Sequence, residues 1–549
     1  MGVPGFFAWL LKQDKRNQMI QNKLHTQPNC LYFDANCLFH PQCFKILKSF
    51  PFESNVNNLE QMMLQRIINY IDYLISYVNP SELVYIAVDG VAPLAKINQQ
   101  RKRRYKSIEE NKIKNDIYKK HNVPNNTNWS NIVITPGTEF MKKLDKKIKE
   151  YIKLLIIKNK NLKIIYSSYE ERGEGEHKIL QYMKKNYKEE KKIHVIYGLD
   201  ADLIFLALSS NMNLIYLLRE QTQFGKKHLS EDKTKKDPIK DVSEQLTYVS
   251  IDNSRQTFNT YFKLRLDKLE DEEIDFIDDF VFLCYFLGND FIPHIPTISI
   301  RHDGIEILLD AYLYAYERSG EKLITVKNNK VEYSRTSFKL FLEFLADMEK
   351  TYFKEEKKSY RQYGAPSHLN ACDKELWELE NLVHVKRKID PFDLYSPFIE
   401  LENAKSKYYL HYLNMRFNLN NQIKNVSKSF FTVLKWVGLY YFDEAPCWNL
   451  QYDYDAAPFI SDIYVNFEQF FEIEIEKSEV SFTIDQQLLS VIPPQANHIL
   501  NNSIQDNMEK LDMIHMLPNK VIYDYEYKDK YWLCEAIMPY LNYEEIIKI

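Results

Sequence analysis

The sequence predicts an α/β protein with a mostly parallel central sheet, helices on both faces of that sheet, and a helical and irregular C-terminal segment packed on it. Two observations lead to this fold class. Over the first 320 residues, short apolar runs rich in β-branched and aromatic residues alternate with helical patterns, which is typical of parallel strands joined by helices. Glycine is scarce (13 residues), whereas 39 tyrosines and 32 phenylalanines can fill a large core. Flexible low-complexity architectures are therefore excluded.

The predicted strands are the apolar runs at residues 30–33, 83–88, 131–134, 163–166, 194–197 and 213–217. The predicted helices lie between them, at residues 58–77, 95–120, 138–158, 176–184 and 201–208. An apolar stretch at 274–287 predicts a buried helix that ends at Gly288. Residues 225–245 are highly charged and have almost no large apolar side chains, so we expect a mobile surface loop there.

The chain has 549 residues, and at roughly 150 residues per domain this length allows three to four domain-sized units. We divide it into a core at residues 1–320, a mainly helical connecting region at 321–420, and a C-terminal segment at 421–549. The C-terminal segment begins with an aromatic-rich helical pattern at 426–442.

The balance of charges and the number and spacing of the cysteines argue against several classes of protein. The 72 Lys and Arg residues nearly balance the 76 Asp and Glu residues, and the net charge is −4, so any polyanion must meet a local basic patch. The seven cysteines are odd in number and form no C-x-x-C pair, which argues against a disulfide framework and a zinc ribbon. Because we find no signal-peptide pattern and no apolar run of about 18 residues, we expect a soluble intracellular protein without a membrane partner.

A set of acidic residues follows the ends of apolar runs. Its members are Asp34, Asp89, Glu174, Glu176, Asp200, Asp202 and Asp290. Because the carboxyl ends of parallel strands lie along one edge of a sheet, these side chains could converge there. The alternative for any single aspartate is a helix N-cap or a turn residue.

Converging carboxylates repel one another unless cations neutralise them, and such hard oxygen ligands select Mg²⁺ or Mn²⁺. Two ions held in this way would suit the hydrolysis of a phosphodiester bond. The acidic set therefore predicts metal-dependent phosphoryl chemistry.

A basic segment at residues 96–106 directly follows the run that ends at Asp89, and it contains no acid. Lys96, Gln100, Arg103 and Arg104 stand at positions i, i+4, i+7 and i+8, which places them on one face of a helix. Such a face close to the acidic edge suits a phosphate group. The alternatives are an ordinary solvated helix face and a nuclear import signal at residues 101–104.

Several short motifs occur in one order along the chain. They are Met1-Gly-Val-Pro4 with Phe6-Phe7, Asp89-Gly-Val-Ala-Pro93 continuing to Asn98-Gln-Gln-Arg101, Thr135-Pro-Gly-Thr-Glu-Phe-Met141, Gly173-Glu-Gly-Glu-His-Lys178, Tyr197-Gly-Leu-Asp-Ala-Asp-Leu203 and Leu287-Gly-Asn-Asp-Phe291. Weaker matches follow at 458–462, 486–494 and 532–540. Together these motifs resemble the XRN family of 5′→3′ exoribonucleases.

The resemblance implies a nuclease core at residues 1–320 similar to PIN and flap nucleases, with the segment at 421–549 forming a wall of its active site. It implies metal ligands at Asp34, Glu174, Glu176, Asp200, Asp202 and Asp290, with Asp89 beside them, and a 5′-phosphate pocket at Lys96, Gln100, Arg103 and Arg104. It further implies that His40 and Trp436 stack on a base. The alternatives for these two are a buried structural histidine and a core tryptophan.

The implied function is a 5′→3′ exoribonuclease that uses two Mg²⁺ or Mn²⁺ ions to degrade single-stranded RNA with a 5′-monophosphate to mononucleotides. We expect a monomer in the cytoplasm, with a nuclear location as the alternative. Two other functions stay open, a structure-specific 5′ DNA nuclease acting on flaps and an inactive RNA-binding scaffold. The phosphate face argues against the first because it demands a free 5′ end. The complete acidic set argues against the second, since clustered carboxylates without a catalytic role destabilise a fold.

Overall fold

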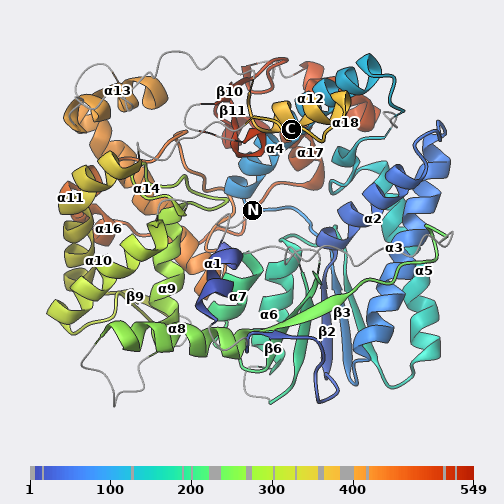
Figure 1. The fold of residues 1–549 in the computed structure, drawn as a ribbon, viewed down its shortest axis with the longest axis horizontal. Coiled ribbons are helices and arrows are strands. Elements are labelled where there is room, and N and C mark those ends of the chain that lie inside the picture. The colour runs from blue at the N-terminus through green and yellow to red at the C-terminus, as the bar shows by residue number, and fades with distance from the viewer. Residues whose placement is uncertain are drawn as a thin grey trace.

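The computed structural model describes residues 6–14, 18–124, 129–187, 191–198, 202–221, 237–266, 275–300, 303–327, 330–356, 364–383, 401–415, 419–510, 515–525, 528 and 530–548 (Figure 1). Its main sheet has seven strands in the order β1-β7-β6-β5-β2-β3-β4. Their bounds are β1 (Ile20–Gln21), β2 (Cys30–Asp34), β3 (Leu83–Ala87), β4 (Lys163–Ser167), β5 (His194–Tyr197), β6 (Ile215–Glu220) and β7 (Leu246–Ser250). The run from β6 to β4 is parallel, and β7 pairs antiparallel with β6. The predicted α/β class with a mostly parallel sheet is confirmed.

The central strands form because apolar side chains point to both faces of the sheet. In β2, Cys30 and Tyr32 belong to one hydrophobic cluster, whereas Leu31 and Phe33 belong to another. The second cluster is covered by α2 (Ala35–Ser49), α3 (Val56–Val78) and α5 (Glu139–Lys158). The first is covered by α1 (Phe6–Gln13), α6 (Gly175–Tyr187), α7 (Asp202–Ser209), α8 (Ile251–Arg265) and α9 (Ile277–Cys284). Strands buried on both faces read as continuous apolar runs, which is why they were visible in the sequence.

The strand order reverses between β2 and β5. The chain proceeds from β2 outward to β3 and β4 on one side, and from β5 to β6 on the other. In open α/β sheets such a reversal creates a crevice at the carboxyl ends of the strands, where sites are built. Asp34, the last residue of β2, lies at this point and pairs in register with Ala87 at the end of β3.

A helical part continues the first hydrophobic cluster, which extends from Phe6 to Ile475. Its elements are η3 (Tyr285–Leu287), α10 (Gly304–Ser319), β8 (Ile324–Lys327), β9 (Lys330–Tyr333), α11 (Arg335–Glu356), α12 (Ala371–Glu380), α13 (Leu401–Leu413), α14 (Leu419–Phe442), α15 (Ile460–Val465) and α16 (Glu468–Glu472). In Figure 1 most of these helices lie on the opposite side of the molecule from α2, α3 and α5. Within the described residues, no helix is both long and apolar enough to span a bilayer.

The C-terminal elements pack around α4 (Leu94–Lys120), as the upper part of Figure 1 shows. They are α17 (Ile484–Val491), η5 (Pro494–Ile499), α18 (Asn502–Lys510), β10 (Ile522–Asp524), η7 (Tyr531–Leu533), β11 (Glu535–Ile537) and α19 (Tyr543–Ile546). Leu94 and Ile97 of α4 share a hydrophobic cluster with Leu488 and Leu541. The buried Arg101 guanidinium donates to the carbonyl oxygens of Met516 and, at 2.8 Å, Pro539. Because Arg101 is buried, the predicted import signal at residues 101–104 is not a continuous surface cluster.

Some predicted elements differ from the structure, and some observed elements were not predicted. The run at 131–134 forms the short 3₁₀ helix η1 (Asn131–Val133) rather than a strand. The predicted helix at 274–287 is α9 followed by the 3₁₀ turn η3, and residue 274 lies outside the described residues. The helix α2, which contains Pro41, and the antiparallel strand β7 were not predicted. The middle region also contains the hairpin of β8 and β9.

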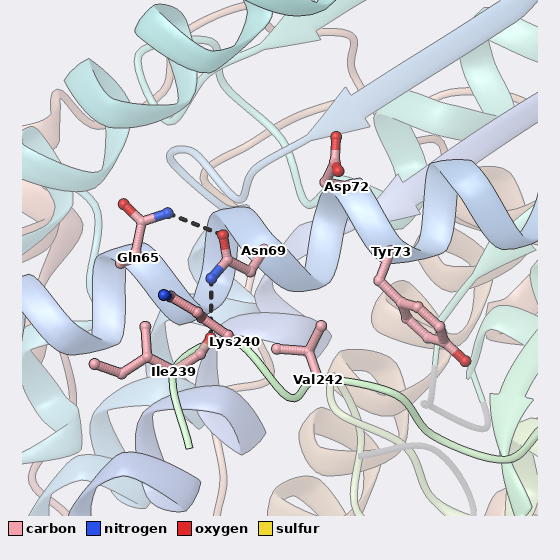
Figure 2. A pocket seen from close by; sticks show the side chains of 7 residues that line it. All are labelled: Gln65, Asn69, Asp72, Tyr73, Ile239, Lys240 and Val242. Carbon is pink, nitrogen blue, oxygen red and sulfur yellow. Dashed lines mark hydrogen bonds between the residues drawn. The ribbon is translucent and has the colours of Figure 1, made fainter. Parts of the chain in front are cut away.

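The charged stretch predicted as a mobile loop is only partly described, since residues 222–236 lie outside the described residues. Residues 237–245 run along α3, where Asn69 Nδ2 donates to the Ile239 carbonyl at 2.9 Å and the Tyr73 hydroxyl donates to the Glu244 carbonyl at 2.8 Å. Figure 2 shows the open pocket of about 470 Å³ between this segment and α3. None of the predicted site residues lines it.

Candidate active site

Asp34 stands where β2 ends and α2 begins. Although it occupies the N-cap position of α2, its side chain makes no capping hydrogen bond. Instead its Oδ2 accepts a hydrogen bond at 2.8 Å from the thiol of Cys37, and the residue is buried. The N-cap alternative therefore does not account for this carboxylate.

Asp89 follows β3 and holds the first residue of α6. Its Oδ1 accepts a hydrogen bond from the Gly175 amide at 2.7 Å. A Cβ atom on Gly175 would lie 2.8 Å from Asp34 Oδ1 and 3.4 Å from Asp89 Oδ1. Glycine therefore leaves room for the Asp34 carboxylate beside the backbone at this position. Burial and the neighbouring Glu174 carboxylate raise the pKa of Asp89.

Glu174 and Glu176 flank Gly175 at the start of α6 and are both buried. Glu174 Oε1 pairs with Lys96 Nζ at 2.6 Å, and its Oε2 accepts from the Tyr440 hydroxyl at 2.8 Å. Glu176 Oε2 is buried and, within the described part of the chain, has no hydrogen-bond partner. Burial, then repulsion by Glu174 and Asp202, raises the pKa of Glu176 well above its ordinary value.

The remaining acids come from two other elements. Asp202 is the first residue of α7 and is buried, and Asp290 follows η3 and is also buried. Asp290 Oδ2 pairs with Lys96 Nζ at 2.7 Å, while its Oδ1 accepts from Gln99 Nε2 at 2.9 Å. Asp200 lies outside the described residues.

Lys96 joins the acidic set to the basic helix α4. Its ammonium group pairs with Glu174 and Asp290 and is buried beside them. Burial alone would lower the pKa of Lys96, but the carboxylates of Asp290 and Glu174 outweigh it and raise that pKa well above its ordinary value. In turn, although burial opposes the charge of Asp290, the Lys96 ammonium holds the pKa of that carboxyl below its ordinary value. Lys96 therefore stays protonated and balances part of the negative charge of the acids.

The other members of the predicted phosphate face, Gln100, Arg103 and Arg104, lie further along α4. Arg104 Nε donates to Thr135 Oγ1 at 3.0 Å, and its Nη1 donates to the Gln100 carbonyl at 3.2 Å and lies 3.5 Å from Gln100 Oε1. Burial, together with repulsion by Arg103, lowers the pKa of Arg104 to about 9. Within the described residues, Arg104 thus donates its hydrogen bonds to neutral groups. A half-buried guanidinium with neutral partners suits an anionic ligand.

The two residues predicted to stack on a base lie in different surroundings. His40 is half-buried on α2. Trp436 is completely buried in α14, where its Nε1 donates to the Cys447 carbonyl at 2.9 Å. Its ring stacks on Tyr440 with 4.8 Å between centroids. The structure therefore favours the alternative of a core tryptophan, and Trp436 is not placed to stack on a base.

Besides Cys37 at Asp34, the sequence did not single out Gln99, which contacts Asp290, or Tyr440, which contacts Glu174. Gln99 belongs to the basic helix, so its proximity to the phosphate face was a signal that could have identified it. Tyr440 is separated from Glu174 by 266 residues and lies in an aromatic-rich helix. Such a pattern is typical of a core helix, so no local signal marks this tyrosine.

The acids fit a divalent cation by their chemistry. They are buried oxygen ligands with raised pKa values at Asp89 and Glu176, and Glu176 Oε2 lacks a partner among the described residues. No three of the described His, Cys, Asp or Glu side chains already form a metal-binding group. The Lys96 ammonium pairs with two of the carboxylates, and Asp200 is not among the residues described.

Comparisons with known proteins cover most of the chain. A family model described as "XRN 5′-3′ exonuclease N-terminus" matches residues 1–221, and one described as "Xrn1 helical domain" matches residues 269–386 and 401–548. Over its whole length the chain is 27% identical to 5′-3′ exoribonuclease 1 of Homo sapiens and covers 34% of that protein. It is 25% identical to 5′-3′ exoribonuclease 1 of Saccharomyces cerevisiae and covers 43% of it. With 5′-3′ exoribonuclease 2 of Saccharomyces cerevisiae it is 32% identical over 57% of this chain and 35% of that protein. The chain spans about one third to one half of the length of these relatives.

Proposed function

Because the chain belongs to the XRN family of 5′→3′ exonucleases, we propose that it is a metal-dependent exoribonuclease that removes mononucleotides from single-stranded RNA with a 5′-monophosphate. The observation that carries this proposal is the pair of contacts from Lys96 Nζ to Glu174 and Asp290. They bring the phosphate face of α4 and the acidic set into one site. A 5′-phosphate held by this face lies next to the carboxylates, so the first phosphodiester bond is the one exposed to hydrolysis.

The phosphate is bound in our proposal by Lys96, Gln100, Arg103 and Arg104. Arg104 is oriented by Thr135 and by Gln100, and these hydrogen bonds go to neutral oxygens, so a phosphate would give its guanidinium a directly hydrogen-bonded counter-charge. Arg103 is exposed and adds positive charge at the mouth of the face. Lys96 must turn from its carboxylates toward the phosphate, since an ammonium cannot keep both sets of partners.

The metal ligands in our proposal are Asp34, Glu174, Glu176, Asp200, Asp202 and Asp290, which would hold Mg²⁺ or Mn²⁺ as two ions. When bound, these cations activate a water molecule and stabilise the leaving oxygen. The protein's own part is to keep the carboxylates buried and oriented. Asp89 contributes by fixing the start of α6 through the Gly175 amide rather than by direct contact with RNA.

The wider organisation of the molecule is also part of the proposal. We assign residues 1–320 as the nuclease core, because the seven strands of the main sheet and the predicted acids lie there. Residues 321–420 connect it to the segment 421–549, which forms a wall beside α4 and the acids; the contacts of Leu488 and Tyr440 support this role. His40 is retained as a base-stacking residue. A monomer in the cytoplasm stays a prediction.

A degradation assay in Mg²⁺ tests the function. RNAs of one sequence with a 5′-monophosphate, a 5′-hydroxyl or a 5′-triphosphate are compared with a DNA flap of the same length. We expect mononucleotides released from the 5′ end of the monophosphate RNA, and no product when the metal is chelated. Cleavage at a DNA junction would instead establish the flap-nuclease alternative. RNA binding without any product in Mg²⁺ or Mn²⁺ would establish the scaffold alternative.

A further inference from the structure

The Tyr440 hydroxyl reaches the acidic set from the helical part of the molecule. It donates to Glu174 Oε2 at 2.8 Å, while Glu174 Oε1 faces Lys96. Because a phenol keeps its proton at neutral pH and an ionised carboxylate only accepts, the direction of this hydrogen bond is fixed. The two oxygens of Glu174 are therefore distinguished, because one accepts from Tyr440 of α14 and the other pairs with the Lys96 ammonium.

The Tyr440 ring is held by buried aromatic neighbours. The Trp436 ring stacks on it with an interplanar angle of 15° and 4.8 Å between centroids. The centroid of the His177 ring lies 3.6 Å from that of the Tyr440 ring. The Phe291 ring meets the Tyr440 ring edge-on, with 5.1 Å between centroids. In the sequence His177 directly follows Glu176, and Phe291 directly follows Asp290. Such packing leaves the hydroxyl little freedom to move.

We propose that Tyr440 is a positioning residue that fixes the orientation of Glu174 for metal binding, with Trp436 and His177 holding its ring in place. This inference rests on the proposed function, because it assigns a purpose to Glu174 as a metal ligand. Hydrogen bonds to a ligating carboxylate orient it, and their loss weakens metal affinity about ten- to a hundredfold in other metal sites. The helix α14, which carries no predicted acid, thereby supplies a group that the metal site needs.

The test uses the full chain, freed of metal, as wild type and as Tyr440→Phe. Isothermal titration calorimetry with Mg²⁺ alone measures metal affinity without RNA or turnover. We expect Tyr440→Phe to bind Mg²⁺ about ten- to a hundredfold more weakly. In a separate assay its rate should approach the wild-type rate at saturating Mg²⁺, with the KM for RNA unchanged, because the substrate face is intact.

The matched control is Tyr452→Phe. Tyr452 is also buried, and its hydroxyl donates at 2.8 Å to the Ala456 carbonyl, so this variant loses a comparable hydrogen bond without touching an acid. Both variants should have similar thermal midpoints without metal, whereas only Tyr440→Phe should lose Mg²⁺ affinity. A wild-type Mg²⁺ affinity for Tyr440→Phe, or an equal loss in Tyr452→Phe, would overturn the inference.

A second variant separates the effect of the Tyr440 hydroxyl on Mg²⁺ affinity from the effect of the packing around its ring. Trp436→Phe keeps the Tyr440 hydroxyl and removes only part of the surface on which its ring stacks, so its loss of Mg²⁺ affinity should be smaller than that of Tyr440→Phe. A larger loss would mean that packing, and not the hydrogen bond to Glu174, decides metal binding. If wild type itself bound no Mg²⁺, the proposed metal-dependent function would fail, which is a different result from equal binding by wild type and Tyr440→Phe.

Discussion

Lys96 is the residue at which two predicted groups of side chains meet. The sequence assigned it to a phosphate face, and the structure pairs its ammonium with Glu174 and Asp290. Both descriptions hold if Lys96 exchanges partners, since a cation that balances buried carboxylates can be released once other cations take its place. A single side chain would then link occupation of the acidic set to recognition of the RNA end.

Asp202 provides the first test at this scale. Asp202→Ala should abolish hydrolysis of 5′-monophosphate RNA while RNA binding persists, because a metal ligand is lost and the basic face remains. Removing one of several repelling carboxylates should leave the metal-free fold at least as stable. Single-turnover rates and RNA affinity in Mg²⁺ measure both effects, and Asp347→Ala, an exposed change on α11, is the control. A near wild-type rate for Asp202→Ala would exclude the metal-site assignment.

The arginines of the phosphate face provide a second test at the scale of residues. Arg103→Ala and Arg104→Ala each remove a charge-assisted contact worth about 1.5–3 kcal/mol, or about ten- to a hundredfold. The loss should appear with 5′-monophosphate RNA and be much smaller with 5′-hydroxyl RNA, as measured by kcat/KM on both. Lys112→Ala, an exposed cation further along α4, should change neither. Equal losses on both RNAs would show that the face contacts the backbone in general.

The residues of the site could be predicted to different extents. Asp34 and Asp89 were visible because each follows a strand that is buried on both faces. The role of Asp89 in fixing Gly175 was not visible, since that hydrogen bond depends on where α6 begins. The positions of Trp436 and Tyr440 could not be predicted either, because helical spacing does not reveal which aromatic ring reaches a carboxylate from a distant part of the chain.

At the scale of elements, α4 is held along much of its length by the C-terminal segment. The amides of Leu94 and Ala95 donate to the carbonyls of Trp448 and Leu450, at 2.8 and 3.1 Å. Further along, Lys106 Nζ donates to the carbonyls of Trp532 and Cys534, at 2.7 and 2.8 Å. Three of the basic residues in the segment at 96–106, Arg101, Lys102 and Lys106, therefore contact the C-terminal segment. The phosphate face is left to the other side of the helix.

A buried carboxylate joins two other elements. Glu349 on α11 accepts hydrogen bonds from the Ile460 amide at 2.7 Å and the Ser461 amide at 3.3 Å, at the start of α15. The charged groups facing it are Lys405 and Asp462, which pair at 2.9 Å. Burial outweighs the hydrogen bond from Ser461 and the charge of Lys405, and it raises the pKa of Glu349 to about 7 from 4.5.

This raised pKa predicts a pH-dependent stability. The folded protein binds the proton of Glu349 more tightly than the unfolded chain, so this stabilisation is present below pH 4.5 and is lost as pH rises through 7. Glu349→Gln removes the dependence. Its free energy of unfolding relative to wild type should therefore increase by about 2–3 kcal/mol between pH 5 and pH 8. Denaturant unfolding at both pH values measures this, with Glu343→Gln on the same helix as control. A constant difference would contradict it.

Helices and strands could be predicted where the pattern of apolar residues is compatible with only one kind of secondary structure. The parallel strands are continuous apolar runs, and α3 and α5 have a clear apolar face. The run at 131–134 has the composition of a strand, but it forms a 3₁₀ turn that buries Ile132 and Ile134 before the Thr138 N-cap of α5. The strand β7 gains its partners from β6 and β1, which a local pattern does not show.

At the scale of the whole molecule, the acids and the basic face are oppositely charged regions of a protein with a net charge of −4. The site must attract one phosphate, although the protein as a whole carries a net negative charge and does not attract RNA. Attraction to the RNA backbone decreases as salt rises because the release of counterions on binding is less favourable at higher salt. Selection of the 5′ end depends instead on the shape and donors of the phosphate face, which salt screens less because Lys96 and Arg104 are buried or half-buried.

End selection should therefore survive conditions that weaken binding. A triphosphate or a cap adds bulk and charge that a pocket formed for one phosphate must exclude, so discrimination is steric as well as electrostatic. We expect the monophosphate RNA to be degraded fastest, the hydroxyl RNA well below it and the triphosphate RNA close to zero, in the same order at every salt concentration. Rates for the three RNAs across a salt series, with circular RNA as the control for internal cleavage, measure this. Degradation of triphosphate RNA as fast as monophosphate RNA would refute the pocket, because a general electrostatic surface would bind the more highly charged end at least as well.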